Sequence, residues 1–287
     1  MRRRDFLRLG LYGGAAATGL PRWAAAQPKK RYASDVVALG NTGIKLSRLA
    51  MGTGTNGVGK SSNQTRKLGL DGLADLFWYG YDQGLRFWDS ADQYGSHPHL
   101  KKALTKVPRD KVVILTKTRA ATAQELRADV DRFRQEIGTD YLDIVLLHAM
   151  TRANWPELRK GAMEALAEAR QKGLVRAHGC SFHSLEALRT GAATPWLQVA
   201  LIRLNPVEAH MDADPRTVIN VAAEMKAARK GIIGMKILGQ GDLRNRVDEA
   251  LAFALRQHCL DCFTIGVESR DELADLIRRI PEASARG

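Results

Sequence analysis

The sequence lacks several features that define whole classes of protein. Its 287 residues include only three cysteines, too few for a disulfide-stabilised scaffold. It contains no run of 18 or more apolar residues, so it predicts no membrane-spanning helix and no stable membrane insertion. No linker rich in proline, glycine or serine divides it. Length alone allows one large domain or two small ones, and the missing linker favours one.

The composition is ordinary for a folded protein, with 45% apolar and 26% charged residues. It excludes a disordered chain, a collagen-like repeat and a coiled coil. Lysine and arginine number 44 against 31 acidic residues, which gives a formal net charge of +13. The basic residues alternate with acidic ones, as Arg127 and Arg132 do with Glu125 and Asp129. This pattern is typical of a solvated surface and argues against a nucleic-acid partner.

Residues 1–26 have the pattern of an export signal. A basic region at Arg2–Arg8 (RRRDFLR) precedes a short stretch of small and apolar residues at 9–20 and three alanines at 24–26. Arg3–Arg8 resembles the twin-arginine motif, so we expect the twin-arginine machinery to export the protein to the periplasm. The alternative is a basic, alanine-rich tail. The segment holds five arginines and one aspartate, so residues 27–287 carry +9.

From residue 35 onward, short apolar runs alternate with longer amphipathic segments. Residues 35–48 predict a β-hairpin around Asn41–Gly43. Segments such as 124–137 and 155–171 have the apolar spacing of helices. Eight such β/α units predict an α/β fold, a (β/α)8 TIM barrel over residues 27–287 with a short N-terminal hairpin. The rival is a doubly wound sheet, and residues 52–57 (GTGTNG) do have the G-x-G-x-x-G spacing of its fingerprint, but eight units in this length match a barrel. The eight apolar runs are 49–54, 85–90, 111–117, 141–148, 174–181, 198–204, 231–238 and 262–267.

Titratable side chains stand where three consecutive apolar runs meet their loops. Asp89 lies near the end of the second run, Lys117 ends the third and His148 ends the fourth. Tyr94 follows Asp89 in the segment DSADQY. The carboxyl ends of the strands carry the active site in a TIM barrel, so we expect these four residues to lie together. A single titratable residue at the end of a strand is more often structural. Titratable residues at the ends of three consecutive predicted strands indicate an active site.

These features together resemble the aldo-keto reductase family. The resemblance is carried by the opening GNTGIKLSRLAMGT at 40–53, the DxAxxY pattern at 89–94, Lys117 and His148, and it extends over nearly all of the predicted barrel. It implies an oxidoreductase that reduces an aldehyde or ketone to an alcohol. The implied cofactor is NADP(H), with NAD(H) as the alternative, and the implied partner is a small carbonyl substrate.

The resemblance also implies a role for each of the four residues. Tyr94 would give a proton to the substrate oxygen while the nicotinamide gives a hydride to the carbon. The pKa of a free tyrosine, about 10, is high for this task. Lys117 would lower it by stabilising the phenolate, and Asp89 would hold Lys117 in place. His148 would donate a hydrogen bond to the substrate oxygen.

Cofactor contacts are implied along the predicted barrel as well. Arg270 is interpreted as a contact to a 2′-phosphate, and the alternative is a solvated charge at a helix start. Phe182 and Leu201 replace an asparagine and a glutamine of the family's carboxamide pocket. The implied cofactor contacts are Gly52, Thr53, Ser181, Lys236, Gly239, Gly241, Ser269, Arg270 and Asp275.

Two alternatives and one cysteine pair remain open. Because two carboxamide contacts are missing, the alternative function is a cofactor-binding sensor or interaction subunit with little turnover. His97, His99 and His183 suggest a metal hydrolase, but a metal site does not require Lys117 and Tyr94, and we expect no metal. The cysteines at 259 and 262 predict either buried small residues or a strained disulfide.

Overall fold

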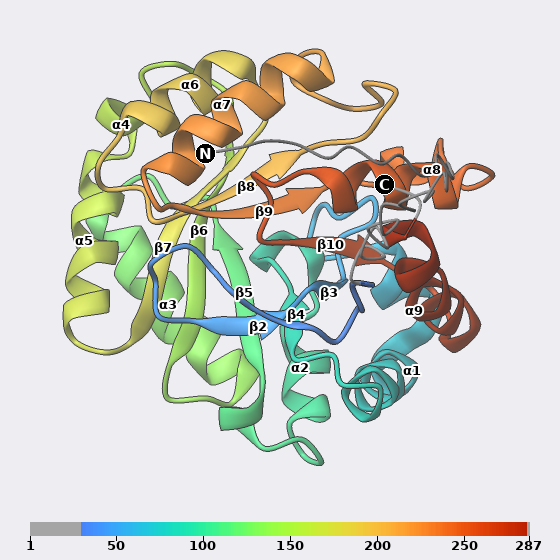
Figure 1. The fold of residues 1–287 in the computed structure, drawn as a ribbon. Coiled ribbons are helices and arrows are strands. Elements are labelled where there is room, and N and C mark those ends of the chain that lie inside the picture. Colours follow the sequence, from blue (N-terminus) through green and yellow to red (C-terminus); the bar gives the residue numbers. More distant parts are fainter. Residues whose placement is uncertain (1–29, 286–287) are drawn as a thin grey trace, which may run out of the picture.

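The computed structural model describes residues 30–285, and the predicted export signal lies outside them. Eight parallel strands close into a barrel in the order β10-β3-β4-β5-β6-β7-β8-β9, surrounded by helices (Figure 1). This confirms the predicted (β/α)8 TIM barrel. The strands of the barrel are β3 (Leu49–Gly52), β4 (Phe87–Asp89), β5 (Val113–Thr118), β6 (Leu142–Met150), β7 (Val175–Phe182), β8 (Val199–Arg203), β9 (Gly231–Met235) and β10 (Cys262–Gly266).

Helices follow the strands as the apolar spacing predicts, although residues 155–171 divide into two helices at Arg159. The helices are α1 (Asn63–Asp82), α2 (His97–Ala103), α3 (Ala123–Ile137), α4 (Trp155–Leu158), α5 (Lys160–Gln171), α6 (Leu185–Ala193), α7 (Pro215–Ala227), α8 (Val247–Arg256) and α9 (Arg270–Ser284). Short 3-10 turns occur at η1 (Asp92–Tyr94), η2 (Arg109–Lys111) and η3 (Gly239–Gly241).

The side chains of the strands divide the apolar core into two layers. One layer fills the barrel and includes Phe87, Leu115 and Leu201. The other lies between the strands and the helices. Successive side chains of a strand point to opposite faces. Cys180 and Phe182 of β7 pack in the outer layer, so Ser181 between them faces the inside of the barrel.

The predicted hairpin, β1 (Val36–Ala38) and β2 (Lys45–Ser47), closes the N-terminal end of the barrel. Leu39, Ile44 and Leu46 pack with the inner apolar layer. Leu39 lies against Gly231, the first residue of β9, where a Cβ would come within 2.6 Å of the leucine Cγ. Apolar side chains therefore fill this end, and the carboxyl ends of the strands are left for ligands.

Asp261 joins the hairpin to the barrel. Its carboxylate accepts hydrogen bonds from the backbone N–H of Gly40 at 3.2 Å and of Ile232 at 2.9 Å. It also pairs with Lys226 from α7. One buried carboxylate thus serves donors from three separate segments.

We expect Asp261→Ala to lower the free energy of unfolding by about 2 kcal/mol, because two backbone donors and an ammonium lose their acceptor. Chemical denaturation followed by tryptophan fluorescence measures this. Asp140→Ala is the matched control. Asp140 is exposed, so its replacement should change the free energy of unfolding by no more than about 0.5 kcal/mol. Equal unfolding midpoints in the two variants would contradict the role given to Asp261.

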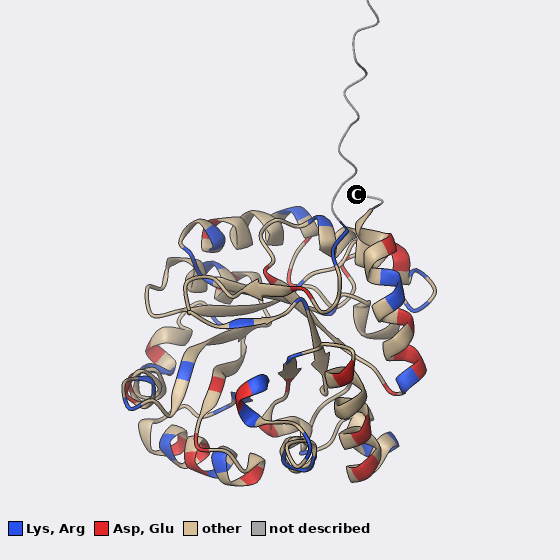
Figure 2. Cartoon of the chain, turned by 60° about the horizontal axis from the view of Figure 1, so that its bottom comes forward, with Lys and Arg blue, Asp and Glu red and all other residues tan. Residues whose placement is uncertain are grey.

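Charged residues of both signs are mixed over the outer helices (Figure 2). Glu168, for example, pairs with both Arg127 and Lys172. The positive charge is therefore dispersed, as the alternating sequence pattern indicated. Within residues 30–285, no helix is both long enough and apolar enough to cross a bilayer.

Cys259 and Cys262 are buried free thiols in this structure. Cys259 packs in the outer apolar layer and Cys262 in the inner one. The two side chains therefore point to opposite sides of the sheet, which explains why this C-x-x-C pair is not bridged here.

Candidate active site

The four candidate catalytic side chains meet at the carboxyl ends of the strands. Asp89 ends β4, Lys117 is the penultimate residue of β5, His148 lies near the end of β6 and Tyr94 ends η1. The rings of Tyr94 and His148 meet edge to face with centroids 5.7 Å apart. The ammonium of Lys117 lies 4.8 Å from the Tyr94 ring centroid. The structure thus brings together all four residues that the sequence singled out.

Lys117 and Asp89 form a buried ion pair. The Lys117 side chain is 1% exposed, and its Nζ donates to Asp89 Oδ1 at 2.5 Å and to the Ser90 carbonyl at 2.7 Å. Burial acts to lower the pKa of Lys117, but the charges of Asp89 and Tyr94 raise it above its ordinary value. The lysine is therefore a fixed cation beside the phenol. The second oxygen of Asp89 accepts the hydroxyl of Thr264 at 2.9 Å, a partner that sequence reasoning missed.

Burial raises the pKa of Tyr94 above its ordinary value, although the charge of Lys117 acts to lower it. The sequence-based prediction of a lowered pKa is therefore wrong for the net shift in this structure. Desolvation penalises the phenolate, and the charge of Asp89 opposes that of Lys117. As a consequence, Tyr94 is protonated at neutral pH, and the charge of Lys117 acts against the burial that makes its proton harder to remove.

Two glycines of the loop after β3 hold the ring of Tyr94. A Cβ on Gly54 would lie 2.3 Å from Cε2 of the tyrosine, and one on Gly57 would lie 2.3 Å from its Cδ1. Side chains cannot be this close, so only glycine fits at both positions beside this ring. Neither residue was predicted as part of the site, although the glycine-rich run MGTGTNGVGK contains both.

His148 is a neutral imidazole. Burial, followed by the charges of Lys117, His183 and Arg119, lowers its pKa well below the ordinary value. Its Nδ1 is buried and has no hydrogen-bond partner among the described residues. A proton on Nε2 leaves only a lone pair unpaired at Nδ1, so we infer that Nε2 is the donor. This is the state needed to hydrogen-bond a carbonyl oxygen.

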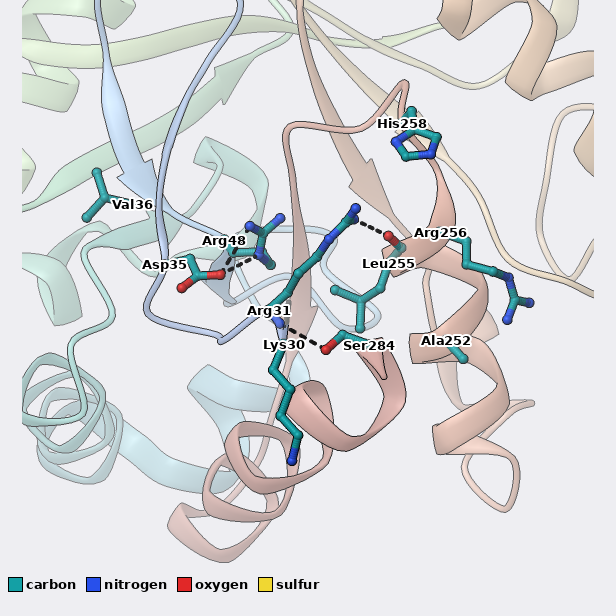
Figure 3. Close-up of a pocket in the computed structure, with 10 residues that line it drawn as sticks. All are labelled: Lys30, Arg31, Asp35, Val36, Arg48, Ala252, Leu255, Arg256, His258 and Ser284. Carbon is teal, nitrogen blue, oxygen red and sulfur yellow. Dashed lines mark hydrogen bonds and ion pairs between the residues drawn. The ribbon is translucent and has the colours of Figure 1, made fainter. Parts of the chain in front are cut away.

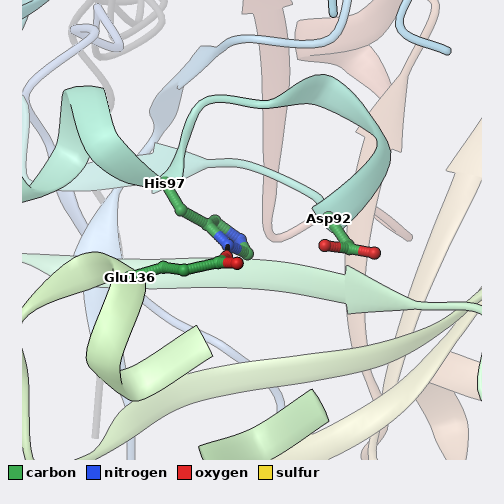
Figure 4. A group of neighbouring side chains, drawn as sticks. All are labelled: Asp92, His97 and Glu136. Atoms are coloured by element: carbon green, nitrogen blue, oxygen red, sulfur yellow. Dashed lines mark hydrogen bonds and ion pairs between the residues drawn. The ribbon is translucent and has the colours of Figure 1, made fainter. Parts of the chain in front are cut away.

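A polar cluster behind Tyr94 joins η1 to α3 (Figure 4). His97 Nδ1 lies 2.6 Å from Glu136 Oε2. Asp92, His97 and Glu136 bring ligand atoms within 4.8 Å of one another, which is close enough for a metal ion. Arg132, however, donates to Asp92 at 2.7 Å and to Glu136 at 2.9 Å, and Lys60 also pairs with Asp92, so both carboxylates already have cationic partners. We infer that the cluster is structural and that it fixes η1, the turn that ends in Tyr94, against α3.

A cavity of about 520 Å³ extends from the catalytic residues to the first turns of α9. Asp89 and Tyr94 line it at one end. It is bordered by β3, β4, β8, β9 and β10, which are five neighbouring strands of the eight in the barrel. The predicted cofactor contacts that line it are Gly52, Lys236, Gly241 and Asp275.

The other predicted cofactor contacts are not among the residues that line this cavity. The Thr53 hydroxyl is buried and donates to the Asp89 carbonyl at 2.9 Å. Ser181 faces the inside of the barrel, where its Oγ accepts the Ala149 N–H at 2.8 Å. Gly239, at the start of η3, is buried.

At the far end, Ser269 caps α9 by accepting the Glu272 N–H at 3.1 Å. The guanidinium of Arg270 lies 5.7 Å from the ring centroid of Tyr79. Of the two departures from the family pattern, Leu201 lines the cavity, whereas Phe182 packs in the outer apolar layer and leaves the cavity free.

A second cavity, of about 730 Å³, lies at the opposite end of the barrel beside the hairpin (Figure 3). Its basic side chains have local partners, since Arg48 pairs with Asp35 at 3.2 Å and Arg31 donates to the Leu255 carbonyl. None of the residues predicted for catalysis or cofactor binding lines it. The larger cavity is therefore separate from the candidate active site.

Comparison with known proteins agrees with this geometry. Residues 48–280 match the model of the aldo/keto reductase family. The chain belongs to this family, as the sequence motifs implied.

Individual relatives are distant. A versiconal hemiacetal acetate reductase of Aspergillus parasiticus is 29% identical over 179 residues, covering 51% of this chain and 50% of the relative. An L-galactose dehydrogenase of Arabidopsis thaliana is 24% identical over 225 residues, covering 72% of this chain and 66% of the relative. The chain thus spans between half and two-thirds of the length of these curated relatives.

Solved structures share the fold. A putative aldo-keto reductase from Pseudomonas aeruginosa superposes with a TM-score of 0.73 at 23% identity, covering 89% of this chain and 98% of that one. An aldo-keto reductase from Bacillus halodurans, in its holo form, has a TM-score of 0.70 at 16% identity, with coverage of 86% and 90%. At these identities the likeness concerns the fold alone.

Proposed function

We propose that this protein uses a reduced nicotinamide dinucleotide to convert an aldehyde or ketone into an alcohol. The observation that carries the proposal is the buried Asp89–Lys117 pair set directly against Tyr94 and His148 at one end of a long cavity. Family membership supports it. The bound cofactor supplies a hydride to the carbonyl carbon, and the chain has to supply a proton to the oxygen.

The four side chains divide this task. The neutral His148 donates a hydrogen bond that orients and polarises the carbonyl oxygen. Tyr94 gives its proton to the same oxygen as negative charge develops there. The phenolate that remains lies beside the ammonium of Lys117, whose attraction is strong because both groups are shielded from water. Asp89 keeps that ammonium in place.

The lining of the cavity fits a dinucleotide. Leu201 and Gly52 give an apolar, open surface next to Tyr94, suited to a flat ring. Lys236 and Arg244 line the cavity together with Gly241, and two cations with a glycine backbone suit a pyrophosphate. These are the residues that would hold the cofactor, with the catalytic residues at one end.

The far end of the cavity favours NADH over NADPH. The sequence predicted NADP(H) because of Arg270, but this guanidinium lies over Tyr79 and is not among the lining residues. Three carboxylates line that end instead, those of Glu268, Glu272 and Asp275. Lys67 pairs with Glu268, and Arg278 and Arg279 pair with Asp275, so within residues 30–285 Glu272 is the one of the three without an ion pair. A carboxylate accepts a hydrogen bond from a ribose hydroxyl and repels a 2′-phosphate.

We expect NADH to bind about tenfold or more tightly than NADPH, which corresponds to about 1.4 kcal/mol. Quenching of tryptophan fluorescence measures both affinities without turnover. Glu272→Gln should reduce the difference between the affinities for NADH and NADPH. Glu164→Gln is the matched control, since Glu164 is exposed on α5. Tighter binding of NADPH would restore the original prediction.

Turnover on a panel of simple aldehydes then tests the reaction itself. Oxidation of the reduced nicotinamide, followed by its absorbance, should depend on the aldehyde. Tight cofactor binding with no turnover on any aldehyde would favour the alternative of a sensor or interaction subunit.

A further inference from the structure

The part of the barrel rim that does not border the cofactor cavity carries an exposed arginine and two histidines. It is formed by β5, β6 and β7. Arg119 directly follows β5, His148 lies near the end of β6 and His183 directly follows β7. A substrate that approaches Tyr94 from this part of the rim meets them first.

Strand pairing places these residues next to one another. Thr118 of β5 is in register with Leu147 of β6, so Arg119 follows alongside His148. The backbone N–H of His183 donates to the Met150 carbonyl of β6 at 2.8 Å. The rings of His148 and His183 have centroids 6.4 Å apart. Arg119 and His183 thus flank the residue that is proposed to bind the carbonyl oxygen.

The histidine that follows β7 is uncharged, and cations surround it. Burial, then the charges of Arg203, Lys236, Arg119 and Lys117, lowers the pKa of His183 to about 3, so its ring is neutral. Arg203 pairs with Asp212 at 3.2 Å, yet its buried Nε has no hydrogen-bond partner in the described part of the chain.

Arg119 differs from the other cations of this rim. It is exposed, and its guanidinium makes no ion pair with any residue between 30 and 285. A neutral substrate that covered it would remove water from the charge and give nothing in return. An anionic substrate would replace that water with a charged partner, and a guanidinium holds carboxylates and phosphates through two parallel hydrogen bonds.

We propose that the substrates are small carbonyl compounds that also carry an anionic group, a carboxylate or a phosphate, and that Arg119 binds this group while the carbonyl lies between Tyr94 and His148. The inference rests on the proposed reductase function and narrows its substrate class. Arg119 is then a specificity-determining residue that lies outside the reacting atoms. His183 lies beside His148 as an uncharged ring that can form hydrogen bonds to the substrate.

Matched pairs of substrates test the inference. Succinic semialdehyde is compared with butanal, and glyceraldehyde 3-phosphate with glyceraldehyde, by kcat/KM with NADH. We expect the anionic member to be preferred by about tenfold or more, because charge-assisted hydrogen bonds are the strong ones. The pair with the larger ratio identifies the carboxylate or the phosphate as the group that is recognised.

Variants assign the effect to Arg119. Arg119→Gln should bring the ratio close to one, mainly by raising KM for the anionic member. Arg256→Gln is the matched control, since Arg256 is exposed at the opposite end of the barrel, and it should keep the wild-type ratio. Equal kcat/KM within both pairs, or an unchanged ratio in Arg119→Gln, overturns the inference and leaves carbonyl reduction standing.

A binding measurement separates this inference from the proposed function. If none of the four carbonyls is turned over, the proposed function fails. Succinate binding, measured by tryptophan fluorescence in the presence of NADH, then tests whether Arg119 binds an anion, independently of turnover. We expect about tenfold weaker binding in Arg119→Gln than in the wild type. Equal affinity in the two proteins overturns the inference.

Discussion

Replacing Tyr94 by phenylalanine should lower kcat for carbonyl reduction by about 10³-fold while NADH still binds, because a positioned general acid contributes factors of this size. The variant removes only the hydroxyl. The ring can keep its place between Gly54 and Gly57, so the shape of the site is retained. Steady-state kinetics measure the loss, and fluorescence titration shows whether cofactor binding is intact.

Tyr32→Phe provides the matched control for this experiment. Tyr32 is 50% exposed near the hairpin and has no role in the site, so its variant should retain wild-type kinetics. Undiminished turnover in Tyr94→Phe would remove Tyr94 as the proton donor. A loss of cofactor binding in parallel with activity would instead show that the substitution disturbs the cavity.

Replacing Lys117 by methionine should have two large effects. Activity should fall by about 10²-fold or more, because the developing phenolate loses its cation. Stability should fall by about 3 kcal/mol, because Asp89 is left as an unpaired buried carboxylate. Kinetics and chemical denaturation measure the two effects separately.

A double variant distinguishes catalysis from folding. In Lys117→Met/Asp89→Asn the uncompensated charge is gone, so most of the lost stability should return while the enzyme stays inactive. Recovery of activity along with stability would mean that Lys117 serves only the fold. The pH dependence of activity gives a further check. Loss of the cation should raise the pKa of Tyr94, so the part of the pH profile that depends on this residue should move to higher pH.

Much of this arrangement could be predicted from the sequence because it depends on local patterns. The short apolar runs of the sequence predicted the strands, and the candidate catalytic side chains lie where those runs end. Closing eight parallel strands into a barrel then places Asp89, Lys117 and His148 on one rim. The hairpin was equally local, since its turn at Asn41–Gly43 lies between two short strands.

What the sequence could not predict depends on distant contacts or on the degree of burial. Thr264 reaches Asp89 only because β10 pairs with β3, and these strands are separated by most of the chain. The net rise in the pKa of Tyr94 reflects how completely the site is enclosed, which no motif encodes.

The division of 155–171 into two helices also has a tertiary cause. Arg159 leaves the helical conformation, and its guanidinium donates to the Arg119 carbonyl at the rim at 2.8 Å. Apolar spacing continues through this residue, so the pattern alone predicted one helix.

The glycines that hold Tyr94 restrict how this enzyme can be diversified. Any side chain at Gly54 or Gly57 would displace the phenol, so random libraries that include the loop after β3 will consist largely of inactive clones. Variation of substrate range has to come from the other part of the rim. There, Arg119 and His183 can change without moving the proton donor.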